Sequence, residues 1–323
     1  MRTIKLIISL SVLLFAATIF AFPISVAAQS HCEPSDPPGE FPALPENLPE
    51  RTSDLAETQR ILVDNIGEIQ SLMLSPNGLF VVARGEHGLY LLNPTNAHIL
   101  YTICEETVNV AISPDARTLV LIGEDMVQLR DVYSGEIVGA IEENWTAAAF
   151  TPDGYFMVVQ DADRTVSVRD IVSLDVLYTL EDVQYFAASP AGDYLAIAGD
   201  AGVQILDLVS GDDVTTLSVS NITAMKFNRS GGWLATVGET VTIWDVETWE
   251  PVLEIEVEAV DISFDPLDDV IAITSEEGLE LWELESESLI HEFECEDCGA
   301  VLAHATGVII TESAHLIFVE FSP

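Results

Sequence analysis

The sequence contains very few basic residues. Lysine and arginine together number 11, against 54 aspartates and glutamates in 323 residues, and the formal net charge is −43 at pH 7. Binding to nucleic-acid phosphates or to anionic lipid headgroups requires patches of positive charge. The composition therefore argues against both kinds of partner. It favours solubility, metal cations or basic partners. The alternative is an acidic surface shared by the proteins of a salty or acidic habitat, without a specific ligand.

Signatures of catalysis and of helices are also lacking. The chain has no Gly-x-Ser-x-Gly elbow, no phosphate-binding loop and no His-Glu-x-x-His metal motif. After the N-terminal segment no stretch has a sustained hydrophobic period of 3.6 residues, so we expect almost no helix. Proline and glycine are not in excess and 49% of the residues are hydrophobic, which is enough for a large buried core. We expect a globular protein, and the sequence shows no recognisable catalytic constellation.

The first 28 residues have the pattern of a secretory signal peptide. Arg2 and Lys5 precede an uncharged apolar run over 6–22, and the small residues at 26–28 suit cleavage before Gln29. The alternative is an uncleaved membrane anchor, because the run is near the lower length limit for a membrane span. We expect a secreted, periplasmic or cell-surface protein with no other membrane insertion. Residues 29–57 follow as a proline-rich acidic linker that we expect to be extended and poorly packed.

Export makes the four cysteines candidates for disulfides. We favour a bond between Cys295 and Cys298, which lie in a Cys-Glu-Asp-Cys turn, together with one between Cys32 and Cys104. The second bond would attach the linker to the domain. The Cys-x-x-Cys turn could instead be half of a zinc site, although no second such turn or pair of histidines accompanies it.

Residues 58–323 repeat with a period of about 38 residues. The clearest marker is an alternating strand that ends in Trp244-Asp245. The same slot holds Leu92-Asn93, Arg130-Asp131, Arg169-Asp170, Leu206-Asp207, Trp282-Glu283 and Val319-Glu320. Each unit has four short strands separated by turn residues, and four strands in about forty residues form the blade of a β-propeller.

The two ends of the repeat complete one another. Residues 60–63 match the fourth strand of the first unit, whereas the last unit ends at Phe321 after three strands. An orphan strand from one end would complete a blade from the other and close the ring without free sheet edges. We therefore predict an all-β fold, a seven-bladed β-propeller over 58–323 whose last blade is closed by the N-terminal strand. We expect it to be a monomer.

The units resemble WD repeats of the WD40 type along the whole of 58–323. An acidic residue lies six positions before the Trp slot in three units, at Asp163, Asp200 and Glu276, and 151–154 read Thr-Pro-Asp-Gly. The Gly-His dipeptide of the family is absent and a true Trp-Asp occurs once, so its His–Asp–Ser/Thr–Trp hydrogen-bonded tetrad should be incomplete. The resemblance implies a rigid, non-catalytic platform for a protein or peptide.

The loops between blades, and those between the second and third strands of each blade, should lie on one face around the axis. The candidates for partner contact are Glu105, Glu106, Glu142, Glu143, Trp145, Glu181, Asp182, Glu296 and Asp297. A rim of carboxylates suits a basic partner or calcium, a hard cation that prefers oxygen ligands, and no other cofactor is expected. The alternative is that acids collect in the solvated turns of any acidic protein.

Two histidines occupy equivalent positions in the first and last units. His87 lies beside Glu86, and His315 lies close to Glu312. Such a set could ligate a metal or act as acid and base, although two unrelated loop histidines would give the same pattern. Three hypotheses remain open: an exported protein- or peptide-binding propeller, a metal-dependent propeller hydrolase or lyase with its site at the axial end of the acidic face, and a structural envelope protein.

Overall fold

The structure is a computed structural model that describes residues 32–38, 41, 55–62, 66–96, 98–151, 153–199, 202–295, 297–304, 307–312 and 315–321. The expected signal peptide, residues 1–28, lies outside the described residues, as do Asp200 and Glu296. Within the described residues, no helix has the length and hydrophobicity needed to cross a membrane.

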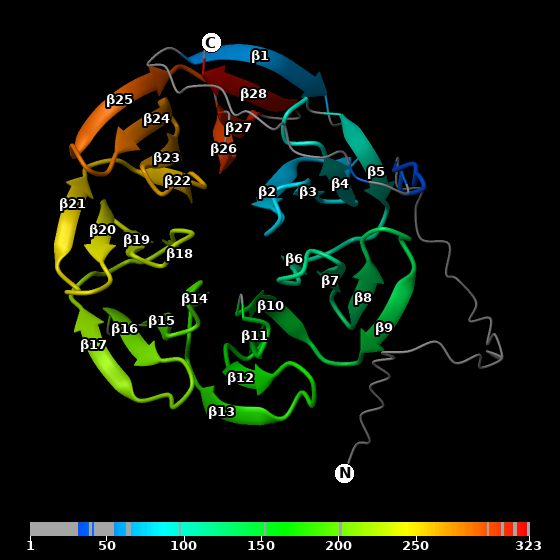
Figure 1. The fold of residues 1–323 in the computed structure, drawn as a ribbon, viewed down its shortest axis with the longest axis horizontal. Coiled ribbons are helices and arrows are strands. Elements are labelled where there is room, and N and C mark those ends of the chain that lie inside the picture. The colour runs from blue at the N-terminus through cyan, green and yellow to red at the C-terminus, as the bar shows by residue number, and fades with distance from the viewer. Residues whose placement is uncertain are drawn as a thin grey trace.

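Within the described residues, 28 strands form seven four-stranded sheets with antiparallel neighbours. The sheets are the blades of a closed ring in which the first strand of each blade lies nearest the axis and the fourth lies at the rim (Figure 1). This is the predicted seven-bladed propeller, and the prediction is confirmed.

The strands of blades one to three run outward from the axis in chain order. Blade one has β2 (Ile69–Leu74), β3 (Val81–Gly85), β4 (Leu89–Leu92) and β5 (Ile99–Ile103). Blade two has β6 (Asn109–Ile112), β7 (Thr118–Ile122), β8 (Val127–Asp131) and β9 (Ile137–Ile141). Blade three has β10 (Trp145–Phe150), β11 (Phe156–Asp161), β12 (Val166–Asp170) and β13 (Val176–Leu180).

Blades four to six follow the same pattern. Blade four has β14 (Tyr185–Ala188), β15 (Tyr194–Gly199), β16 (Gly202–Asp207) and β17 (Asp213–Leu217). Blade five has β18 (Ala224–Phe227), β19 (Trp233–Val237), β20 (Val241–Asp245) and β21 (Pro251–Ile255). Blade six has β22 (Ala259–Phe264), β23 (Val270–Ser275), β24 (Gly278–Glu283) and β25 (Ser288–Phe293).

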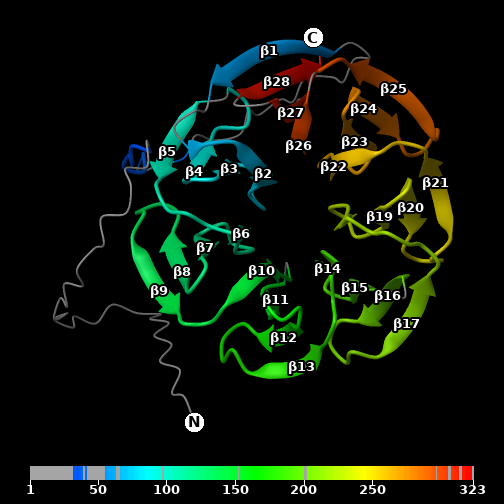
Figure 2. The same ribbon diagram turned by 180° about the vertical axis from the view of Figure 1, so that it is seen from behind.

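Blade seven is composite. Its inner three strands are β26 (Cys298–His304), β27 (Gly307–Glu312) and β28 (His315–Phe321), and its outer strand is β1 (Leu55–Leu62). β1 runs antiparallel to β28, and views from both sides of the ring show the two strands together at the rim (Figure 1, Figure 2). The N-terminal strand therefore closes the ring as predicted. It begins at Leu55, inside the segment that the sequence assigned to the linker.

Packing between neighbouring blades forms the core. The middle strands are buried on both faces, so β4 and β23 are continuous buried runs rather than alternating ones. The outer strands β9 and β13 are largely exposed. One buried cluster joins Leu91 and Tyr101 of blade one to Val110 and Leu121 of blade two. Burial of an apolar side chain of this size stabilises a fold by about 1.5–3 kcal/mol, so the ring is held mainly by contacts between blades.

The acid that ends the third strand of a blade caps the next turn. Asp170 Oδ1 accepts hydrogen bonds from Val172 N at 2.9 Å and Ser173 N at 2.8 Å, and Asp207 does the same for Val209 and Ser210. Hydrogen bonds from Ser173 and Val172 lower the pKa of Asp170. The acid of the Trp-Asp slot is therefore a structural residue.

The linker is better packed than the sequence suggested. Residues 32–38 and Phe41, here called the N-terminal strap, lie against blades one and two. Cys32 is bonded to Cys104, and Ser35 exchanges hydrogen bonds with Thr102 in β5, from Ser35 N to Thr102 O and from Thr102 N to Ser35 Oγ. Phe41 packs with ring centroids 5.2 Å from Phe80 and 5.0 Å from Tyr133. A disulfide, hydrogen bonds and aromatic contacts thus attach the strap at Cys32, Ser35 and Phe41, while residues 33–36 are exposed to solvent.

Candidate functional site

Loops from two neighbouring blades meet on one face of the ring. The β3–β4 loop supplies Glu86 and His87, and the β5–β6 loop supplies Glu106 and Thr107. The β7–β8 loop of blade two joins them at the same cleft. We call the side of the ring that carries these loops, and their equivalents in other blades, the acidic face.

The candidate partner residues of the acidic face fall into two groups. Some are exposed to solvent: Glu106, Glu142, Glu181, Asp182 and Asp297. The others are engaged inside the structure, because Glu105 and Glu143 form ion pairs and Trp145 is only 2% exposed. The exposed acids are therefore available to a partner. Glu105, Glu143 and Trp145 instead make contacts within the blades that support the loops of the acidic face.

Two arginines occupy the Trp slot and hold these inner acids. Arg130 of β8 pairs with Glu105, and Arg169 of β12 pairs with Glu143 at 2.9 Å. The two arginine side chains are 15% and 14% exposed. In blade five the slot is filled by Trp244, whose Nε1 donates to Thr236 Oγ1 at 3.0 Å. The incomplete tetrad is thus replaced in blades two and three by an ion pair between the third strand and the loop before the first.

Glu143 is held by two donors. Trp145 Nε1 donates to Glu143 Oε2 at 3.0 Å, and the Arg169 guanidinium lies 5.6 Å from the Trp145 ring centroid. Burial alone would raise the pKa of Glu143, but the hydrogen bonds from Trp145 and Arg169 and the Arg169 charge together lower it. The three side chains line a cleft of about 460 Å³ beside Asp161 and Asp163.

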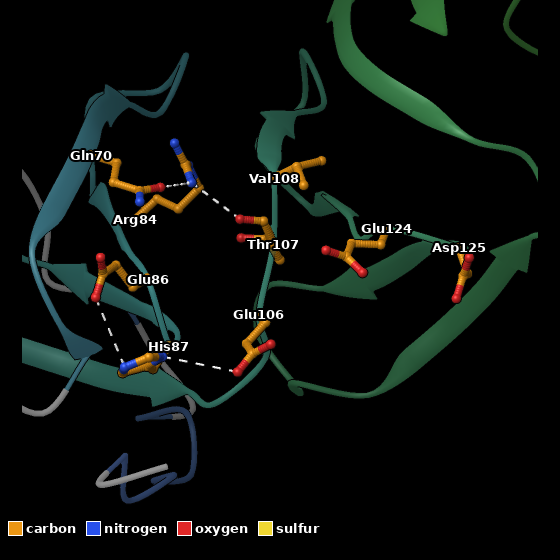
Figure 3. Close-up of a pocket in the computed structure, with 9 residues that line it drawn as sticks. All are labelled: Gln70, Arg84, Glu86, His87, Glu106, Thr107, Val108, Glu124 and Asp125. Atoms are coloured by element: carbon orange, nitrogen blue, oxygen red, sulfur yellow. Dashed lines mark hydrogen bonds and ion pairs between the residues drawn. The ribbon is translucent and has the colours of Figure 1, made fainter. Parts of the chain in front are cut away.

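A larger cleft of about 720 Å³ lies between blades one and two, with Arg84 in its wall. We call it the Arg84 cleft. Its other lining residues are Gln70, Glu86, His87, Glu106, Thr107, Val108, Glu124 and Asp125 (Figure 3). Four of these are exposed carboxylates, Glu86, Glu106, Glu124 and Asp125. The cleft therefore combines a cationic group with an acidic rim.

Neutral acceptors hold the Arg84 guanidinium. Nε donates to Ser71 Oγ at 3.2 Å. Nη1 donates to Gln70 Oε1 and to Thr107 O, the latter at 3.1 Å (Figure 3). Nη2 makes no hydrogen bond to any described residue, and no described carboxylate forms an ion pair with Arg84. Burial lowers the pKa of Arg84. These hydrogen bonds fix the orientation of the guanidinium group, but no described carboxylate neutralises its charge by direct contact.

His87 lies between two carboxylates. Its Nε2 is 3.9 Å from Glu86 Oε2 and its Nδ1 is 3.9 Å from Glu106 Oε1 (Figure 3). The other predicted pair lies in blade seven, where His315 and Glu312 face each other across β27 and β28 and Glu312 also pairs with Arg60. No group of three or more His, Cys, Asp and Glu side chains among the described residues is arranged to hold a metal ion. His87, His315, Glu86 and Glu312 therefore do not form one ligand set.

The cysteines form two disulfides, Cys32–Cys104 and Cys295–Cys298, and no described cysteine is free. The Cys-x-x-Cys turn is therefore not half of a zinc site in this structure. Glu296, inside that turn, lies outside the described residues.

Sequence reasoning missed Arg84 and Thr107, and it placed Arg130 and Arg169 in the Trp slot without predicting their ion pairs. These pairs could have been found, since each arginine follows an acid in the preceding blade-to-blade loop, Glu105 and Glu143, at nearly the same interval. Nothing in the sequence marks Arg84, because its role depends on loops of two blades that meet in space.

The comparisons with known proteins agree with this fold. No protein-family model matches the chain. Over 109 residues it is 28% identical to an uncharacterized WD repeat-containing protein of Synechocystis sp., a match that spans 31% of this chain and 31% of that protein. The chain thus covers about a third of this relative's length. The β-propeller domain of Cps50 (Swd1) from Myceliophteria thermophila superposes with a TM-score of 0.70 over 83% of this chain and 100% of that domain.

The resemblance to WD-repeat proteins is confirmed. The solved propeller is 14% identical to this chain, so it shows a shared fold and no shared ligand. The WD-repeat-like propeller described here departs from the family pattern at the Trp slot, where Arg130 and Arg169 replace the indole.

Proposed function

We propose that this protein is a non-catalytic interaction platform that binds a basic protein or peptide through the acidic face, outside the cytoplasm. The observation that carries the proposal is the Arg84 cleft, whose rim of four exposed carboxylates is presented by loops on a rigid ring. Clustered carboxylates steer and orient cationic partners. The two disulfides support an oxidising compartment.

The rigidity of the acidic face supports binding without large rearrangement. The loops that form the Arg84 cleft are anchored on both sides by buried strands, such as β4 and β7. A surface that is already ordered loses little conformational entropy when it binds. WD-repeat-like architecture is consistent with this role, because the fold presents many loops around one axis.

Affinity capture combined with cross-linking tests the proposal. The bait is the full chain, with a variant in which Glu86, Glu106 and Glu124 become Gln and Asp125 becomes Asn. The matched control removes four exposed acids from turns on the opposite face: Glu136, Asp175, Asp212 and Glu250. We expect the wild type and the control to retain a salt-sensitive partner whose lysines cross-link to the acidic face, and the cleft variant to lose it. Equal capture by both variants would contradict the proposal.

A further inference from the structure

Arg84 differs from the other arginines of the acidic face. Arg164, in the β11–β12 loop, forms no ion pair with a described residue but is exposed to solvent, whereas Arg60, Arg130 and Arg169 each form an ion pair with a carboxylate. Arg84 forms none with a described residue, although the chain has 54 acids and four of them lie around the same cleft. Its neutral partners Ser71, Gln70 and Thr107 orient the guanidinium and leave Nη2 available.

A second group in the cleft lacks a partner. Thr107 is 9% exposed, and its Oγ1 is a buried hydroxyl without a hydrogen bond in the described structure. The carbonyl of the same residue accepts a hydrogen bond from Arg84 Nη1. A buried polar group without a hydrogen-bond partner destabilises the fold by about 1–3 kcal/mol. Where such a group adjoins a cleft, a bound ligand can supply the missing partner. Two donors, the Arg84 guanidinium and the Thr107 hydroxyl, are therefore left for the same small region.

An arginine with free N–H groups beside a hydroxyl donor is an anion subsite, and a carboxylate matches the planar guanidinium. The charges at the rim of the cleft determine which kind of anion can bind there. Glu86, Glu106, Glu124 and Asp125 repel a multiply charged anion such as phosphate, but they attract a ligand that also carries a cation. Val108, 44% exposed in the same lining, offers an apolar contact for an aliphatic stem.

We propose that the Arg84 cleft binds an α-carboxylate joined to a basic side chain, as in the free C-terminus of a chain that ends in lysine or arginine. The carboxylate contacts Arg84 Nη2, and a rotation of the Thr107 side chain brings its buried Oγ1 to the same carboxylate. The cationic side chain extends over Val108 to the acidic rim. This inference rests on the proposed function and specifies the partner chemistry of that site. Free lysine or arginine carries the same two charges and is the second source of this ligand.

Calorimetric titration of the full chain with short peptides tests the inference. The probes are acetyl-Gly-Ser-Ala-Lys with a free carboxylate, the same peptide as the C-terminal amide, a free-carboxylate peptide ending in Glu, free lysine and inorganic phosphate. We expect the amide and the Glu peptide to bind at least about tenfold more weakly than the Lys peptide, since a charge-assisted hydrogen bond contributes about 1.5–3 kcal/mol, and phosphate to show no binding.

Two substitutions separate binding from folding. Arg84→Gln should weaken the free-carboxylate peptide at least about tenfold and leave the amide unchanged. Thr107→Val removes a hydroxyl that has no partner, so it should weaken the same peptide without lowering the urea midpoint. The matched control is Arg229→Gln, which removes an exposed cation from a cleft formed by turns on the opposite face, and it should bind like the wild type.

Equal affinity for the acid and the amide, or unchanged binding by Arg84→Gln, would overturn the inference. In that case a salt-sensitive partner lost by the four-acid variant would still support the proposed function. If that partner is also kept by the four-acid variant, both proposals fail. Free lysine that binds as tightly as the peptide supports the inference with a small molecule as the source of the ligand.

Discussion

Arg169 donates from Nη2 to Glu143 Oε2 at 2.9 Å, and its guanidinium lies over the ring of Trp145 at 5.6 Å from the centroid. The pair connects the third strand of blade three to the loop before its first strand, at the slot where blade five has Trp244. Trp244 bonds instead to Thr236 of the second strand, β19, so the same slot connects different parts of the blade in blades three and five.

Removing either partner of this pair should destabilise the ring. We expect Glu143→Gln and Arg169→Met each to lower the free energy of unfolding by about 1–2 kcal/mol, with a coupling of about 1 kcal/mol in the double variant, because the pair is partly solvent-screened. Urea denaturation of the four proteins measures this. Strictly additive losses would show that the two side chains do not act together.

The same pair predicts a dependence on pH. The folded pKa of Glu143 is below its ordinary value of 4.5, so its stabilisation is complete above that value and is lost as the pH falls through the folded pKa. The difference in urea midpoint between the wild type and Glu143→Gln should therefore be constant from pH 7 to about 5 and shrink below about 4.5. A difference that stays the same at pH 3 would contradict the assignment.

His304 should make the stability of the fold depend on pH in a higher pH range than Glu143 does. Burial lowers its pKa to about 4, from an ordinary value of 6.5. Between these values the unfolded chain binds a proton that the folded chain does not, so stability should fall as the pH drops from 6.5 toward 4, by up to about 3 kcal/mol. Denaturation at pH 7 and pH 4.5 should show a smaller loss for His304→Gln than for the wild type. The exposed residue His98, changed to Gln, is the control and should behave like the wild type.

The indole of Trp244 should contribute through its hydrogen bond as well as its volume. Trp244 and Thr236 are both buried, at 7% and 1% exposure. Trp244→Phe leaves the Thr236 hydroxyl without this donor, and we expect a loss of about 2–3 kcal/mol in urea denaturation. The double variant Trp244→Phe/Thr236→Val should lose less free energy of unfolding than the sum of the losses in the two single variants. An additive result would mean that the hydrogen bond contributes nothing.

The N-terminal strap should detach without loss of the ring. Its disulfide closes a separation of 72 residues, for which the chain-entropy estimate is about 4 kcal/mol. We expect Cys32→Ser/Cys104→Ser to expose residues 32–41 to limited proteolysis while the β-sheet circular dichroism of the ring is kept. Phe41→Ala, with the disulfide intact, should make the strap partly sensitive to limited proteolysis. Loss of the β-sheet signal in the cysteine variant would show that the strap is part of the cooperative fold.

The sequence was sufficient to predict the architecture because the strand and turn pattern recurs in every unit. A strand that is ambiguous in one unit can be recognised from its equivalents in the others. Seven copies of one strand and turn pattern indicated the blades, and the spacing of the end strands indicated the composite closure between β1 and β28. The packing of the strap was not predictable, since a proline-rich composition describes the backbone and says nothing of where Phe41 docks. The Arg84 cleft was not predictable either. Its donors come from β3 and from the loop after β5. That Arg84 is held by neutral acceptors, and not by one of the chain's many acids, is decided by side-chain geometry that the repeat pattern does not encode.

The pairing of Leu55 with Phe321 across β1 and β28 sets the order in which this protein can mature. β1 is synthesised before the other described strands and β28 after them, so blade seven cannot form until the chain has been made through β28. Contacts this distant in sequence form slowly, and until they form both strands present open hydrogen-bonding edges to other chains. A ribosome that stalls before β28 would therefore release a chain that is prone to aggregate rather than a smaller working ring.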